Sequence, residues 1–186
     1  MLLKGSGPLD RATYVALYSG QQPVVAGFAH ALTTFGDPNI LVAASLGVAI
    51  WLYRTGHRNQ TWLFLGTMFG GRALVEAQKL LVDRPRPAVE AHLVVVKTAS
   101  FPSGHAANSM IFYVTLALLL ATRTRWKSHA IAGAILLSLM IGTSRVMLGV
   151  HWPSDVIGGW TFGLLWVVAA IALAQRAFKI PVGTHA

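Results

Sequence analysis

The sequence contains no cysteine, which excludes disulfides, thiolate nucleophiles and thiolate metal sites. Acidic residues are also scarce, with six Asp and Glu among 186 residues. No cluster of carboxylates lies near the motifs described below, so the sequence offers no obvious ligands for a divalent metal ion. We therefore expect a protein that needs neither a metal ion nor another cofactor.

Charged residues make up only 11% of the chain, whereas hydrophobic residues make up 54%. The mean hydropathy is +0.57. This composition is too apolar for an ordinary soluble domain and indicates one compact membrane domain over residues 1–186.

Basic residues outnumber acidic ones, and the formal net charge is +9. They do not alternate with aromatic residues along a stripe, as they do in nucleic-acid-binding proteins. They gather instead at the ends of hydrophobic segments and in the motifs. We therefore expect membrane lipids and a lipid phosphate as partners, and no nucleic acid. The sequence does not indicate an oligomeric state.

Runs of apolar residues predict five membrane-spanning helices separated by short polar loops. Gly, Ser and Ala inside these segments favour close helix packing in lipid. The expected fold is an all-α integral membrane bundle of about five to six transmembrane helices. The predicted spans are residues 38–53, 61–82, 106–122, 129–148 and 156–174.

The N-terminal segment, residues 9–35, is apolar but interrupted by Ser19, Gly20 and Pro23. We interpret it as a pair of short amphipathic helices lying at the membrane interface. A sixth, poorly marked span is the alternative.

Basic residues outside the predicted spans indicate the orientation of the chain. If the helices alternate in direction, one end of the bundle carries most of these residues and is therefore cytoplasmic. The three motif clusters then meet at the opposite end, which faces the periplasm or the exterior of a bacterial-type inner membrane. The basic residues of the cytoplasmic end are Arg54, Arg58, Arg123, Arg125, Lys127, Arg176 and Lys179.

The first motif cluster ends the second predicted span. Lys79 lies about one turn before that end, where a lone ammonium group is costly. The prolines on either side of Arg86 stop the helix, so that Arg86 can fold back and face the same anion as Lys79. Snorkelling of both side chains to the headgroups is the alternative. Asp83 and Arg84 fit that alternative better.

The second cluster, Pro102-Ser103-Gly104-His105, starts the third predicted span. Pro102 suits a first helical turn, which would leave the amides of Ser103 and Gly104 unpaired at a helix N-terminus, where anions bind. Gly104 leaves room for a phosphate, Ser103 adds a hydroxyl donor, and His105 lies at the rim. A simple helix cap is the alternative.

The third cluster contains Ser144-Arg145, His151 and Asp155. Arg145 can clamp phosphate oxygens with two hydrogen bonds. Pro153 starts a new helix, so Asp155 lies in its first turn and can reach the ring of His151. A carboxylate that accepts one ring N–H leaves the lone pair of the other nitrogen free for attack. An interfacial histidine anchor capped by Asp155 is the alternative.

Together, in this order and at this spacing, the three clusters resemble the signature of the type 2 phosphatidic acid phosphatase superfamily, which includes vanadium haloperoxidases and bacterial acid phosphatases. The resemblance implies that His151 is the nucleophile, that Asp155 is its partner, and that His105 protonates the leaving group. It also implies a helical core without a metal requirement. The phosphate-binding residues that it implies are Lys79, Arg86, Ser103, Gly104 and Arg145.

The expected activity is that of an integral membrane phosphatase that hydrolyses a lipid phosphate or diphosphate through a phosphohistidine. We expect undecaprenyl diphosphate as the substrate, with phosphatidylglycerol phosphate, phosphatidic acid or a lipid A phosphate as alternatives. A haloperoxidase and a non-catalytic lipid-binding or lipid-flipping protein are two other classes. The predicted spans argue against the first, and the intact pair His105 and His151 argues against the second.

Two further ionisable residues lie inside the second predicted span. Arg72 and Glu76 are four residues apart, so they can form an intramembrane ion pair one turn before Lys79. A pair that supports Lys79 and a contact with the substrate both remain open.

Overall fold

A computed structural model describes residues 6–121 and 124–178. Within these residues the chain forms α-helices and no strand, as the all-α prediction requires. The helices are α1 (Pro8–Leu17), α2 (Pro23–Thr34), α3 (Pro38–Arg54), α4 (Arg58–Val82), α5 (Gly104–Leu120), α6 (Lys127–Met147) and α7 (Pro153–Phe178).

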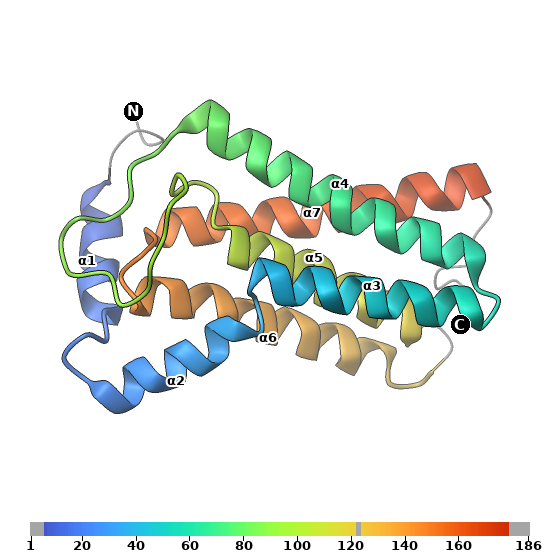
Figure 1. Cartoon of the computed structure of the whole chain (residues 1–186), viewed down its shortest axis with the longest axis horizontal. Coiled ribbons are helices and arrows are strands. Elements are labelled where there is room, and N and C mark those ends of the chain that lie inside the picture. Colours follow the sequence, from blue (N-terminus) through green and yellow to red (C-terminus); the bar gives the residue numbers. More distant parts are fainter. Residues whose placement is uncertain (1–5, 122–123, 179–186) are drawn as a thin grey trace.

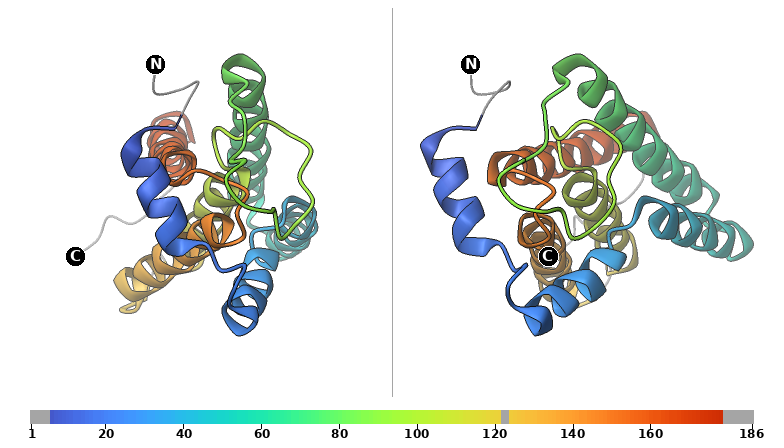
Figure 2. Two further views of the ribbon diagram at one scale, coloured as in Figure 1. Left: turned by 90° about the vertical axis from the view of Figure 1, so that its left-hand side faces the viewer. Right: turned by 60° about the vertical axis from the view of Figure 1, so that its left-hand side comes forward.

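Helices α3 to α7 lie side by side along the long axis of the molecule, and α1 crosses one end of this bundle (Figure 1). In the end-on views of Figure 2, the loop between α4 and α5 covers the same end. Helix α5 is central, because it packs against α3, α4, α6 and α7. The junction between α6 and α7 also lies at the end crossed by α1, so the three motif clusters gather there.

Small residues set the close packing of α5 against α7. A Cβ atom at Gly159 would lie 2.7 Å from the carbonyl oxygen of Ser103, and one at Gly163 would lie 2.8 Å from that of Ala107. Gly159 and Gly163 are four residues apart and therefore occupy one face of α7. This is the glycine spacing that lets membrane helices approach backbone to backbone, and it agrees with the packing expected from the sequence.

The five predicted spans correspond to α3 through α7, and the interrupted N-terminal segment forms the two short helices α1 and α2. Among the described residues, three stretches are long and apolar enough by length and hydropathy alone to cross a membrane, namely residues 23–54, 127–147 and 153–176. Helix α4 carries three charged residues in its second half, Arg72, Glu76 and Lys79, and α5 has only 17 residues. Both are packed into the bundle nonetheless. The interfacial position of the N-terminal helices stays a prediction.

Candidate active site

The loop after α4 binds both cations of the first motif cluster, Lys79 of α4 and Arg86 of the loop itself. Helix α4 ends at Val82, before the first proline, and its cap residue Asp83 has a positive φ of 43°. Lys79 is buried, and its Nζ donates to Thr98 Oγ1 at 2.9 Å. Arg86 folds back as expected: its Nε donates to Thr98 O at 2.7 Å and its Nη1 to Val150 O at 2.7 Å. Thr98 therefore holds both cations on the same side of the site.

The second cluster forms the N-terminus of α5, but not as predicted. Pro102 precedes the cap residue Ser103 instead of lying in the first helical turn, because α5 begins at Gly104. The amide of Ser103 is not free, since it donates to the carbonyl oxygen of Asp155 at 3.0 Å. The Oγ atom of Ser103 is buried without a hydrogen-bond partner among the described residues. This hydroxyl is therefore the unpaired donor that Ser103 offers to an anion.

Gly104 faces Lys79 across the site. A Cβ atom at Gly104 would lie 3.8 Å from Lys79 Nζ and 3.8 Å from Asn108 Nδ2. The absence of a side chain thus keeps the space in front of the ammonium group open. His105 follows at the rim and is partly exposed. A Cβ atom at Gly36, in the link between α2 and α3, would lie 3.3 Å from the His105 ring.

His151 and Asp155 lie together where α6 passes into α7. His151 is 2% exposed, and its Nδ1 lies 3.5 Å from Oδ2 of Asp155. Its Nε2 lies 3.2 Å from Nη1 of Arg86. Burial lowers the pKa of the His151 imidazole to about 3, although the hydrogen bond with Asp155 acts in the opposite direction. The ring is therefore neutral, and with Nδ1–H directed at Asp155 the lone pair on Nε2 faces the cations.

Asp155 is held by more partners than the sequence suggests. Its Oδ2 accepts hydrogen bonds from Ser100 Oγ at 2.5 Å and from the amide of Trp152 at 2.9 Å. Its Oδ1 pairs with Nη1 of Arg84 at 2.5 Å. The residue is fully buried, so these contacts replace the water that an exposed carboxylate would bind.

Arg84 corrects the sequence interpretation, which placed it in the headgroups. It is 2% exposed and joins Asp155 to Asp10 of α1, whose Oδ2 lies 2.9 Å from Arg84 Nη2. Asp10 also accepts from the amide and hydroxyl of Ser154 at 2.9 and 2.6 Å. A buried guanidinium needs a counter-charge. The one hint in the sequence at the partner of Arg84 is that Asp10 is the only acidic residue before Asp37.

Arg145 comes from the end of α6 and is 4% exposed. Its Nη1 donates to Thr33 Oγ1 of α2 at 2.8 Å. Its Nε is buried and has no hydrogen-bond partner among the described residues. The role of Thr33 was not visible in the sequence, because nothing in the pattern of α2 distinguishes it from the neighbouring Thr34.

All eight predicted site residues thus lie at one end of the bundle. The ion pair that the spacing of Arg72 and Glu76 allows is not formed: the two side chains do not pair with each other among the described residues. The described part of the chain also holds no group of three or more His, Cys, Asp or Glu arranged to bind a metal ion. Metal independence itself stays a prediction.

Comparisons with known proteins point to one family. A sequence model of the PAP2 superfamily matches residues 60–179. The chain is 35% identical to phosphatidylglycerophosphatase B of Bacillus subtilis, over 76% of this chain and 70% of that protein. It is 36% identical to decaprenylphosphoryl-5-phosphoribose phosphatase of Mycobacterium tuberculosis, over 82% and 83% respectively. The crystal structure of a transmembrane PAP2-type phosphatidylglycerolphosphate phosphatase from Bacillus subtilis superposes with a TM-score of 0.84 at 26% identity, covering 92% of this chain and 87% of that one.

Proposed function

The chain belongs to the PAP2 superfamily and is a membrane lipid phosphatase, and we propose that it removes the terminal phosphate of a lipid through a phosphohistidine at the extracytoplasmic face. The observation that carries this proposal is the position of His151. Its Nε2 lies 3.2 Å from Arg86, at the edge of a group of cations and helix-end donors, while its Nδ1 is directed at Asp155.

In the proposed first step, Nε2 of His151 attacks phosphorus and a bond to nitrogen forms as the bond to the lipid oxygen breaks. His105 donates a proton to the departing oxygen. In the second step, water attacks the phosphohistidine while His105 takes a proton from it, and inorganic phosphate and free His151 result.

The phosphate would lie among Lys79, Arg86, Arg145 and the start of α5 at Ser103 and Gly104. Charge that develops on the equatorial oxygens is stabilised best by donors that are already in place. Hydrogen bonds to Thr98 and Thr33 hold all three of these cations before any substrate binds. This arrangement supports catalysis by the side chains of the protein itself.

The orientation is proposed from charge. The end of the bundle opposite the site holds the end of α3, the start of α4, the start of α6 and the end of α7 (Figure 1). These helix ends carry Arg54, Arg58, Lys127 and Arg176, and Arg125 precedes α6, whereas Arg123 and Lys179 lie outside the described residues. Loops rich in Lys and Arg remain in the cytoplasm, so the site faces the periplasm or the exterior of a bacterial-type inner membrane.

Two substrate classes fit the proposed chemistry. The first class is a diphosphate such as undecaprenyl diphosphate, which we expect from the sequence. Its leaving group is a phosphate monoester, which needs less protonation by His105 than an alkoxide leaving group does. The second class is favoured by the names of the two relatives. Those names describe a terminal phosphate on a glycerol or a ribose, which in turn carries a lipid phosphoryl group. The classes differ in the distance between the terminal phosphate and the second anionic group.

Phosphate release tests the proposal. Purified protein in detergent should release inorganic phosphate from at least one of undecaprenyl diphosphate, phosphatidylglycerol phosphate, phosphatidic acid and a lipid A phosphate. Its activity should be undiminished after treatment with a chelator. Rapid acid-free quenching with a radiolabelled substrate should trap label on His151. Loss of activity with chelator and recovery with a divalent ion, or label on another residue, would require a different mechanism. A lipid-flipping protein would release no phosphate at all.

A further inference from the structure

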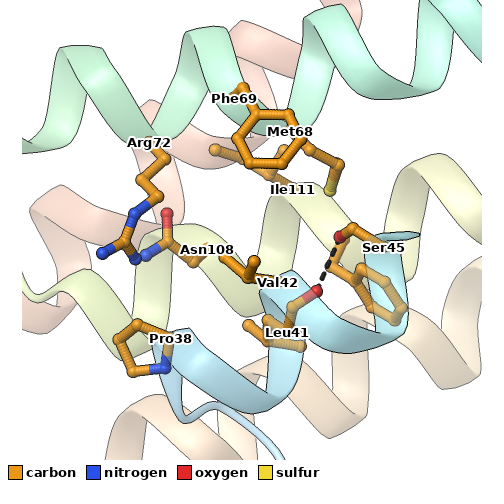
Figure 3. Close-up of a pocket in the computed structure, with 10 residues that line it drawn as sticks. Pro38, Leu41, Val42, Ser45, Met68, Phe69, Arg72, Asn108 and Ile111 are labelled. Carbon is orange, nitrogen blue, oxygen red and sulfur yellow. Dashed lines mark hydrogen bonds between the residues drawn. The ribbon is translucent and has the colours of Figure 1, made fainter. Parts of the chain in front are cut away.

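A groove between α3, α4 and α5 is lined by residues of all three helices (Figure 3). Its walls are mostly apolar, with Leu41 and Val42 from α3, Met68 from α4 and Ile111 from α5. Two polar side chains, Arg72 and Asn108, lie together in it. The groove therefore combines mostly apolar walls with one cationic position.

Arg72 has no evident counter-ion. It forms no ion pair and no hydrogen bond with the residues that the structure describes, and Glu76, one turn away on the same helix, does not pair with it. A guanidinium inside a membrane bundle is costly unless something offsets its charge. In Figure 3 its side chain extends toward Asn108 and Pro38 and away from the apolar part of the groove.

The polar end of the groove adjoins the phosphate site. Asn108 is 8% exposed, and its Nδ2 would lie 3.8 Å from a Cβ atom at Gly104, one turn earlier on α5. Pro38 follows two residues after Gly36, which lies against the ring of His105. Asn108 therefore places the polar end of the groove next to Gly104, at the start of α5.

Resting on the proposed function, we propose that Arg72 and Asn108 bind a second anionic group of the substrate, a phosphodiester separated from the terminal phosphate by a short polyol or sugar. Lys79 and Arg72 are seven residues apart on α4, which corresponds to about 10 Å along the helix axis. The phosphates of a diphosphate share one oxygen and would both lie near Lys79. A phosphodiester one glycerol or one ribose away would lie near Arg72, with the lipid chain along the apolar walls.

The test compares two kinds of substrate in matched detergent. Phosphatidylglycerophosphate carries the separated phosphodiester, whereas phosphatidic acid and undecaprenyl diphosphate do not. In Arg72→Gln the KM for phosphatidylglycerophosphate should rise about 10- to 100-fold, the range expected for one lost hydrogen bond to a charged group. Its kcat should change far less, and the KM for the other two lipids should change about twofold at most. Arg72→Lys should restore part of the loss, because it returns the charge without the planar guanidinium.

Arg58→Gln is the matched control, because Arg58 lies at the opposite end of the same helix. Melting temperatures of all variants in detergent show whether the fold is retained. An equal rise of KM for all three lipids in Arg72→Gln, or an unchanged KM for phosphatidylglycerophosphate, would overturn this inference and leave the proposed function standing. If the unaltered protein hydrolyses none of the lipids, the proposed function falls and this inference falls with it.

Discussion

The phosphate end of the bundle and the groove between α3 and α4 both place cations among apolar helices, but they treat those cations differently. At the phosphate end, Lys79 and Arg86 bind Thr98, Arg145 binds Thr33, and Arg84 pairs with two carboxylates. In the groove, Arg72 has no such partner among the described residues.

This difference separates two functions of a buried cation. Donors that are already fixed can stabilise charge in a transition state without reorganising, which suits the phosphate end. A cation without a fixed partner is instead stabilised most when a ligand brings the opposite charge. Such a cation suits selection among substrates. If the phosphate end is organised in this way, substitutions there should lower activity or stability in a graded order.

The largest expected effect is at His151. The substitution His151→Gln removes the proposed nucleophile, and turnover should fall by about 10⁴-fold or more, as it does when a nucleophile is removed from other hydrolases. Initial rates of phosphate release measure this. His129→Gln, at an exposed histidine near the start of α6, is the control and should retain full activity. A residual rate within tenfold of the unaltered protein would rule out His151 as the nucleophile.

A second prediction concerns Arg84, which links α1 to Asp155. Its side chain is 1% exposed and that of Asp155 is 0% exposed, so Arg84→Met leaves a buried carboxylate without its counter-charge. Breaking such a pair costs about 3 to 5 kcal/mol. We expect a marked fall of the melting temperature in detergent and a large loss of kcat.

Asp10→Asn provides the graded comparison for Arg84. It removes only the outer carboxylate, which is 11% exposed, and should cost less stability than Arg84→Met while leaving Asp155 paired. If both variants have the melting temperature and activity of the unaltered protein, the network does not position Asp155.

Thr33 should show a smaller effect. Thr33→Val keeps the shape of the side chain but removes the acceptor for Arg145 Nη1, and a hydrogen bond to a charged group contributes about 1.5 to 3 kcal/mol. We expect kcat/KM to fall about tenfold or more. The neighbour Thr34 is exposed and binds only His30 O of its own helix, so Thr34→Val should have no effect. Equal kcat/KM values for the two variants would contradict a positioning role for Thr33.

The smallest predicted effect is on pH dependence. Burial lowers the pKa of His151 to about 3, whereas an unfolded histidine has a pKa of about 6.5. Between these values the unfolded state binds a proton that the folded state does not, so stability falls as the pH falls. The melting temperature should therefore drop between about pH 6.5 and pH 4.5, and less steeply in His151→Gln. Identical slopes would show that His151 is not held neutral by the fold.

Local pattern in the sequence was enough to identify the catalytic candidates. His151 and Asp155 are four residues apart, with Pro153 starting a helix between them, so chain geometry alone brings them together. Similarly, α4 ends at Val82, shortly before the prolines that flank Arg86, and α5 starts at Gly104, after Pro102. The five long helices follow from runs of apolar residues, because a backbone in hydrocarbon must satisfy its own hydrogen bonds.

Only the tertiary structure decided what supports those candidates. Arg84 reaches Asp10 across 74 positions, and Arg145 reaches Thr33 across 112. These contacts depend on how α1 and α2 dock against α6 and α7, and no local periodicity encodes that docking. The spacing of Arg72 and Glu76 likewise left two alternatives open, and no ion pair between them is present among the described residues. Helical spacing makes a contact possible, but the packing of α3 and α5 around α4 decides where each side chain lies.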